Sequence, residues 1–222
     1  MTSMRNQTRN VSLAYQVFER LENDILSGKY HRGEVLTELQ LCTDLGVSRT
    51  PVREAIHRLE AEHIIEATDR GMVVLGITQE DVEAIYAIRE CIEWMAAAAC
   101  AVKATDEQIE ALKEVVDLQE FYTAKQEAER VRQLDSEFHE LIYRFSGSTV
   151  YYDTLLPLHK KIQKVRKASC ENPKRAMNAS AEHRLLYEAI AAHDPEAAKA
   201  AMSRHIHNAR AHMQTLNHNF DD

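Results

Sequence analysis

The sequence predicts a mainly α-helical protein with an N-terminal winged helix-turn-helix over residues 1–78 and an all-α six-helix bundle over residues 79–222. Three observations support this fold class. Two short helical segments meet at Gly46, two apolar runs flank a polar turn at residues 68–71, and only helical periodicity follows residue 78. The 6 glycines and 4 prolines fall mostly in the expected loops.

The helical pair has recognisable start and stop signals. Thr37 followed three residues later by Gln40 is a capping-box pattern, which predicts a short helix that begins at about Glu38. Gly46 permits a sharp turn at its end. Ser48 is the expected N-cap of the second helix, and Pro51 fits its first turn, where a missing N–H costs little. Four apolar residues at i, i+3, i+4 and i+7 predict its buried stripe: Val52, Ala55, Ile56 and Leu59.

The other side of the second helix suits the reading of DNA. Its polar residues lie beside the apolar stripe, near the helix N-terminus: Arg49, Thr50, Arg53 and His57. A helix N-terminus with two outward arginines, held by a packed partner helix, is how helix-turn-helix proteins reach base edges. The alternatives are ordinary solvated charges, or a winged helix that binds another protein.

A β-hairpin is expected directly after the second helix. Two mainly apolar runs, residues 64–67 and 72–75, surround the turn Thr68-Asp69-Arg70-Gly71. A hairpin at this place is the wing of a winged helix. Arg70 and Gly71 at its tip suit a minor groove, because glycine permits close backbone approach and arginine is attracted by the negative potential there.

The overall charge does not favour nucleic-acid binding by itself. The net charge is −8, and residues 1–78 carry 9 Lys and Arg against 11 Asp and Glu. Phosphate contact needs only a local basic surface, however. Four arginines of the first part can supply one: Arg49, Arg53, Arg58 and Arg70.

Composition argues against membrane and secreted classes. The longest apolar run, residues 94–102, is far shorter than the roughly 20 residues of a membrane span. The N-terminus lacks the apolar core of a signal peptide. The four cysteines form no CxxC pair, which indicates neither a zinc knuckle nor a disulfide framework. We therefore expect a cytoplasmic protein that does not contact a membrane.

Residues 36–41 and 46–55 together resemble the N-terminal signature of GntR-family bacterial transcription regulators, and more narrowly of their FadR branch. The resemblance covers the first third of the chain. It implies double-stranded operator DNA as a partner. It also implies that Arg49 and Arg53 read guanines, that Ser48 and Thr50 touch phosphate or bases, and that Gly71 lies at the wing tip.

Six helical segments are expected in the second part, over residues 79–103, 106–127, 129–146, 149–170, 175–192 and 195–217. Pro157 should kink or interrupt the fourth of them. Asp135 and His139 stand at i, i+4 and so share one helix face. With His183 and His205 they would form a good ligand set for a divalent transition metal. Because the chain has 11 histidines, packing or surface roles are the alternative.

The same residues resemble the FCD effector domain of FadR-branch regulators, in its six-helix, VanR-like variety. The resemblance rests on residues 135–139, 182–184 and 205–206. It implies that four residues hold a metal inside the bundle: Asp135, His139, His183 and His205. Zinc and nickel both suit this ligand set. The resemblance further implies that open coordination positions admit a small carboxylate effector.

Two arginines are candidates to bind such a carboxylate. Arg89 lies where the family places an arginine on the first helix of the domain, and Arg132 precedes Asp135 by three residues. Either guanidinium could bind a carboxylate through two hydrogen bonds. The alternative for both is an ordinary ion pair, with Glu93, Glu90 or Asp135.

The sequence therefore favours a ligand-responsive transcription regulator, a homodimer on a short palindromic operator whose DNA affinity changes with the effector. A metal-dependent, hydrolase-like enzyme is the alternative, because three histidines, a carboxylate and an open position also describe hydrolase sites. It is disfavoured because no further Glu or His is placed as a general base. A third hypothesis keeps the regulator but makes the metal purely structural.

Overall fold

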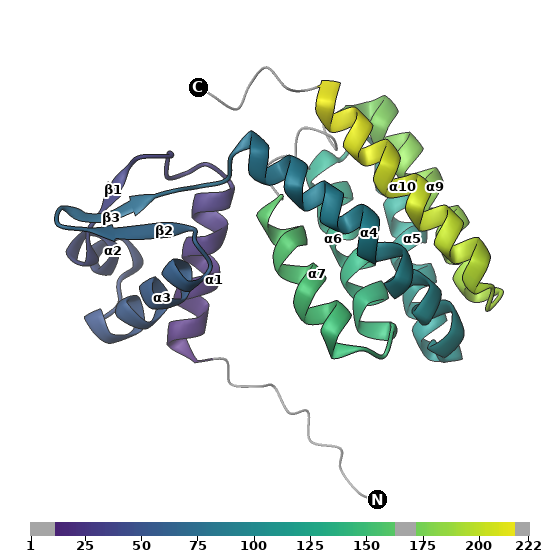
Figure 1. The fold of residues 1–222 in the computed structure, drawn as a ribbon, viewed down its shortest axis with the longest axis horizontal. Helices are drawn as coiled ribbons and strands as arrows, with labels where there is room; N and C mark the ends of the chain where they lie inside the picture. The colour runs from purple at the N-terminus through teal and green to yellow at the C-terminus, as the bar shows by residue number, and fades with distance from the viewer. Residues whose placement is uncertain (1–11, 163–171, 216–222) are drawn as a thin grey trace, which may run out of the picture. The chain divides into compact units, whose positions relative to one another are not determined.

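The computed structural model describes residues 12–162 and 172–215. The chain divides into two compact units between Ile77 and Thr78. The described residues confirm the predicted fold class: a helix-turn-helix with a small antiparallel sheet, followed by helices alone (Figure 1). No helix in this part of the chain is long and apolar enough to cross a membrane.

The first unit contains three helices and three strands. In chain order they are α1 (Leu13–Leu26), β1 (Val35–Leu36), α2 (Glu38–Leu45), α3 (Arg49–Ala61), β2 (Ile65–Thr68) and β3 (Gly71–Val74). The Thr37 side chain accepts a hydrogen bond from the Gln40 amide at 3.3 Å, as the capping pattern predicts. Gly46 ends α2 in the left-handed conformation, at φ 67°.

The core of the first unit is built on the predicted stripe of α3. Its apolar residues are all buried: Val52, Ala55, Ile56 and Leu59. They pack in one cluster with Leu21 of α1, Leu41 of α2 and Val74 of β3. This burial holds the opposite side of α3 toward solvent.

The sheet has a strand that the periodicity does not predict. β1 pairs with β3, and β3 pairs with β2, so that β3 is central. The pairing of Thr68 with Gly71 leaves Asp69 and Arg70 as the turn, with Gly71 already in the strand. Gly71 has φ +133°, and a Cβ there would lie 2.6 Å from the Leu36 carbonyl oxygen. The approach of β1 therefore requires this glycine, independently of any contact with DNA.

The second unit has six helices in its described residues: α4 (Gln79–Lys103), α5 (Asp106–Ala124), α6 (Ala128–Phe145), α7 (Thr149–Lys161), α9 (Pro173–Ala191) and α10 (Pro195–Thr215). Full capping boxes at Thr78 and Thr105 start α4 and α5. Helix α7 continues through Pro157, so the expected interruption there is wrong. The expected extension of this helix over residues 163–170 lies outside the described residues.

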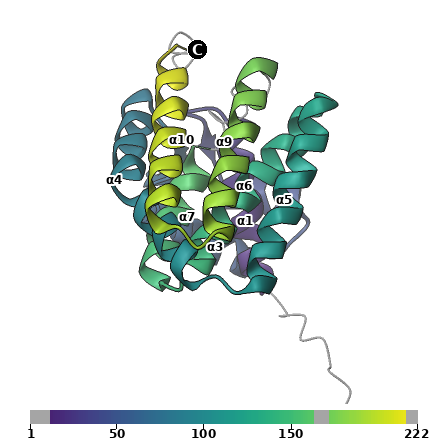
Figure 2. The ribbon, with the colours of Figure 1, turned by 90° about the vertical axis from the view of Figure 1, so that its right-hand side faces the viewer.

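These six helices enclose one interior. Helix α10 packs between α4 and α9, and α5 packs against α6 and α9 (Figure 2). Helix α6 also contacts α4 and α7. Side chains from α4, α5, α6, α9 and α10 consequently meet inside the bundle.

Replacing Gly71 by Ala should destabilise the protein by about 1–3 kcal/mol, because the new Cβ meets the Leu36 carbonyl and the backbone conformation is strained. Gly46→Ala is the matched control, since φ is also positive there but no atom lies within 4 Å of the added Cβ. Urea unfolding monitored by circular dichroism measures both. Equal losses in the two variants would show that the contact with β1 is unimportant.

Candidate functional site

The side chains proposed to contact DNA are exposed on the first unit. Arg49, Arg53 and His57 follow one another at four-residue spacing from the first residue of α3, and Thr50 lies beside them. Ser48 is the N-cap residue, but its side chain makes no capping hydrogen bond. The exposed face therefore offers two guanidinium groups, an imidazole and two hydroxyls at the N-terminal end of one helix.

Arg53 is held in place by a residue that the sequence analysis did not select. Its Nε lies 2.9 Å from both carboxylate oxygens of Glu38, in the first turn of α2. The hydrogen bond from Arg53 lowers the pKa of Glu38. The contact joins the two helices of the pair on their exposed side and restricts the directions that Arg53 can take. Its sequence signal is weak, because 15 residues separate the partners.

The other two proposed contacts are also exposed. Arg70 belongs to the turn of the hairpin, as expected of a wing tip. His57 has a side chain that is 78% exposed, with its Nδ1 3.4 Å from a carboxylate oxygen of Glu60. Neither residue is needed for the packing of the unit.

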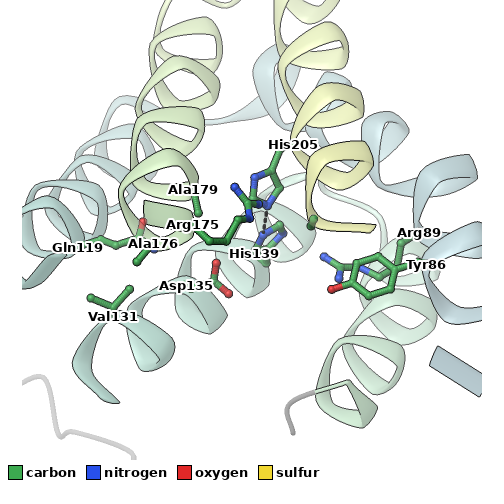
Figure 3. A pocket seen from close by; sticks show the side chains of 11 residues that line it. Tyr86, Arg89, Gln119, Val131, Asp135, His139, Arg175, Ala176, Ala179 and His205 are labelled. Carbon is green, nitrogen blue, oxygen red and sulfur yellow. Dashed lines mark hydrogen bonds between the residues drawn. The ribbon is translucent and has the colours of Figure 1, made fainter. Parts of the chain in front are cut away.

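The four proposed metal ligands meet inside the second unit. Asp135 and His139 come from α6, His183 from α9 and His205 from α10, and all four are buried. His139 Nε2 lies 3.2 Å from His205 Nε2, and His183 Nε2 lies 3.3 Å from the same atom. Asp135 Oδ1 is 3.6 Å from His183 Nε2. Figure 3 shows His139 and His205 facing each other, with Asp135 close to them.

These separations fit a common ion. Metal–nitrogen bonds of about 2.1 Å place neighbouring ligand atoms roughly 3.0–3.4 Å apart at octahedral or tetrahedral angles. His205 has that spacing to both His139 and His183, and the three residues form a group able to hold a metal.

The far nitrogen of each imidazole has an acceptor beside it. His183 Nδ1 is 2.7 Å from Gln119 Oε1 of α5, and His205 Nδ1 is 2.8 Å from Glu182 Oε2. His139 Nδ1 is 3.2 Å from an oxygen of Glu93 in α4. A proton on each Nδ1 leaves a lone pair on each Nε2, which is the tautomer that a metal ligand needs. The sequence analysis selected none of these three acceptors for this role.

Burial favours the neutral form of two of the imidazoles, His139 and His205. Burial lowers the pKa of His205 to about 4, although the Glu182 carboxylate opposes this shift. Burial also lowers the pKa of His139. A neutral imidazole can present a lone pair to a cation, as a metal ligand must.

Arg89 and Glu93 form a buried ion pair beside His139. Arg89 donates from Nε and Nη2 to the two oxygens of Glu93, at 3.0 and 3.1 Å. Although burial opposes it, Arg89 keeps the pKa of Glu93 well below its usual range. The hydroxyl of Tyr143 also donates to Glu93. Arg89 Nη1 is buried and has no hydrogen-bond partner among the described residues.

A cavity of about 40 Å³ adjoins three of the four proposed ligands, Asp135, His139 and His205. Its polar lining includes Arg89, Gln119 and Arg175, together with Asp135 and His139. Figure 3 shows Arg175 extending from α9 beside the ring of His205. The sequence analysis did not select Arg175, which lies 30 residues from His205 and meets it only through the packing of two helices.

Arg132 is not among the lining residues. Its guanidinium donates to both oxygens of Glu129, one helical turn earlier, at 2.6 and 3.0 Å. The expectation that Arg132 faces the metal site is therefore not met. The ion-pair alternative applies to it, although with a different partner from those expected.

Comparison with known families and proteins agrees with both units. Residues 13–74 match the gntR family of bacterial regulatory proteins, and residues 84–208 match the FCD domain. The chain belongs to the GntR family and carries an FCD domain. An uncharacterised HTH-type transcriptional regulator of Bacillus subtilis, YdhC, is 30% identical over 202 residues, which is 90% of each chain.

A second relative, the gluconate operon transcriptional repressor of B. subtilis, is 27% identical over 96% of this chain and 82% of its own. The solved structure of Escherichia coli McbR/YncC shares the fold, with a TM-score of 0.80 and 23% identity over 93% of this chain and 99% of that one. The protein is thus a transcription regulator with a GntR-type DNA-binding unit, and not an enzyme.

Substituting Glu38 by Ala should reduce the preference for operator over random DNA about tenfold, because Arg53 would lose the group that orients it. Binding to random DNA should not weaken, since a negative charge is removed near the phosphates. Glu54→Ala, at an exposed position of α3, is the matched control.

Fluorescence anisotropy with an operator selected from random DNA by the unmodified protein gives both affinities. An unchanged ratio in Glu38→Ala would mean that Glu38 does not position Arg53.

Proposed function

We propose that the protein is a ligand-responsive transcription repressor that binds a short palindromic operator as a homodimer. A divalent transition metal, zinc or nickel, is held by Asp135, His139, His183 and His205, and a small carboxylate beside it changes the affinity for DNA. The observation that carries the proposal is the convergence of three buried imidazole Nε2 atoms, 3.2 and 3.3 Å apart.

The DNA-reading part of the proposal is supported by the exposed face of α3. Arg49 and Arg53 extend from a helix that is fixed by its buried stripe, and Glu38 orients the second of them. An oriented guanidinium suits the two acceptors that guanine presents in the major groove. Arg70, on the turn between β2 and β3, supplies a second basic contact for an adjacent groove.

The metal part is supported by the buried acceptors around the ligands. Gln119 and Glu182 orient the rings of His183 and His205, and Glu93 lies 3.2 Å from Nδ1 of His139, so that the ligand atoms are arranged before an ion arrives. A bound ion would accept the converging lone pairs. If it has more than four coordination positions, or if its fourth position is flexible, it would also accept an anion.

The charge of the pocket favours a monoanionic effector. Asp135, Arg89 and Arg175 line it, and two further carboxylates, Glu93 and Glu182, contact His139 and His205 and pair with the two arginines. With a divalent ion these groups leave one net positive charge. Burial makes an unbalanced charge costly, so that a single carboxylate is favoured over a dicarboxylate.

The shape and the hydrogen-bond donors of the cavity agree with a small acid. About 40 Å³ gives room for about three water molecules and therefore for a ligand of a few heavy atoms. Arg89 Nη1 and Gln119 Nε2 are buried donors without partners among the described residues, and both residues line the cavity. A carboxylate or hydroxy-carboxylate would satisfy them.

Helix α4 is the element through which the effector would act. It carries Arg89 at the cavity, and only four residues separate its first residue from the end of β3. A ligand that binds one arrangement of α4 better than another shifts the population of DNA-competent molecules. The effect on DNA affinity equals the difference in effector affinity between the two arrangements.

Replacing Arg49 and Arg53 together by Ala should abolish selective binding to the operator and leave the metal content unchanged, because the two sites lie in different units. Anisotropy titrations and elemental analysis of the same preparation measure the two properties. Operator affinity retained by the double variant would refute the assignment of the reading helix.

Removing the metal with a chelator should lower the melting temperature by several degrees, and a small monocarboxylate should raise it only in the metal-loaded protein. His183→Ala should lose bound metal and this response, whereas His207→Ala, exposed on the same helix as His205, should keep both. Stabilisation by metal without any response to acids would favour a purely structural ion. Full metal content in His183→Ala would exclude that ligand.

A further inference from the structure

A second cavity lies beside the one at the proposed metal ligands. Its volume is about 440 Å³, against about 40 Å³ for the first, and we call the two the outer and the inner cavity. The walls of the outer cavity include Lys174, Arg175, Asn178 and Glu182 from α9, with Asn208 and Ala211 from α10. Lys174, Asn178 and Ala211 are exposed, so this cavity opens to solvent.

The lining of the outer cavity is almost entirely polar. Among its described residues the largest apolar side chain is that of Ala211, which offers little to a hydrocarbon. Lys174 and Arg175 carry two positive charges against one negative charge on Glu182. His212 also lines the cavity, and its Nε2 is buried without a hydrogen-bond partner among the described residues. The lining therefore suits a small polar anion.

Arg175 lies between the two cavities. It is the one described residue that lines both of them, and it is only 9% exposed. Its Nη1 donates to Glu182 Oε2 at 3.1 Å, and the same oxygen lies 2.8 Å from Nδ1 of His205. Figure 3 shows the Arg175 side chain beside the ring of His205. Side chains of one ion pair, and not a helix backbone, thus separate the open cavity from a proposed metal ligand.

We propose that the outer cavity is a first binding site for the small carboxylate, from which Arg175 transfers it to the inner cavity. Lys174 attracts the anion, and Arg175 exchanges the carboxylate of Glu182 for that of the ligand. The exchange leaves no buried charge unpaired, because Glu182 keeps contacts with His205 and with Asn208 Nδ2, the latter at 2.8 Å. The inference rests on the proposed function in one respect, which is the carboxylate effector.

A passage that is closed by a side chain has a kinetic signature. Rotation of a side chain is much faster than the separation of packed helices, so the acid can enter and leave while the bundle stays folded. Blocking the outer cavity raises the barrier between the free and bound states without changing the free energy of either state. The rates of entry and exit therefore fall by the same factor, and the dissociation constant does not change.

Substituting Ala211 by Trp tests the passage directly. The indole would occupy the outer cavity from α10, at an exposed position. Acetate is the probe, added to protein loaded with cobalt(II), whose visible spectrum reports its coordination in stopped-flow experiments. Both acetate rates should fall about tenfold or more with an unchanged dissociation constant. Met177→Trp, at a 63% exposed position of α9 outside the lining, is the matched control and should keep the parental rates.

Asn178→Trp blocks the same cavity from its other wall, on α9, and should have the same effect as Ala211→Trp. Circular dichroism and cobalt content show that each variant is folded and loaded. Parental acetate rates in both blocked variants would overturn the proposal. A weaker affinity at an unchanged exit rate would mean that the substitutions damage the inner cavity, and would overturn it as well.

Reversing the charge of Lys174 tests the attraction of the anion. Lys174→Glu should slow acetate association about tenfold at low ionic strength, and added salt should reduce the difference from the parent. Lys199→Glu, on α10 and outside the lining, is the matched control. An equal loss in the two variants would show that the net charge of the protein acts, and not the outer cavity.

The outcomes separate this inference from the proposed function. If acetate and other small monocarboxylates leave the cobalt spectrum unchanged, the proposed carboxylate effector fails, and the role of the outer cavity fails with it. If acetate binds and both blocked variants exchange it at the parental rates, only the outer cavity is wrong. Slower exchange at an unchanged dissociation constant supports both.

Discussion

The approach of three buried imidazole rings is the constraint on which the second unit depends. Their Nε2 atoms lie 3.2 and 3.3 Å apart, and to hold an ion together each ring would present a lone pair there and keep its proton on the far side. That requirement places Gln119 in α5, Glu182 in α9 and Glu93 in α4. Glu93 is a buried carboxylate, and it needs Arg89 in turn. The two buried charged residues of α4, Arg89 and Glu93, are thus explained by one group of histidines.

The functional groups of the first unit have the opposite requirement, because they must remain exposed to water until DNA binds. The buried stripe of α3 is fixed by α1 and the sheet, which leaves the arginines outside. The ion pair of Arg53 with Glu38 adds orientation without burial. Because this pair is exposed, it contributes little to stability. The ion pair instead fixes the orientation of the Arg53 guanidinium. One carboxylate holds this group while its remaining donors stay available.

Local signals in the sequence predicted most of the helices and strands, but few of the residues that contact the proposed site residues. Periodicity and caps located α3 and the helices of the second unit, because both depend on residues within one or two turns. Strand β1 was missed because two residues carry no periodicity. Gln119 and Arg175 were missed because helix packing alone brings them to the site. Arg132 was expected at the site because of its position on the helix, but its guanidinium forms an ion pair with Glu129, one turn earlier.

The burial of the four ligands affects the residence time of a bound ion rather than its affinity. Asp135, His139, His183 and His205 are between 0 and 7% exposed and belong to three helices. An ion bound among them can leave only when those helices separate, so its residence time follows the rate of local opening and not the rate of diffusion. A regulator built in this way would retain the metal acquired while the bundle was forming, and would respond to the acid long before it registered a change in the metal supply.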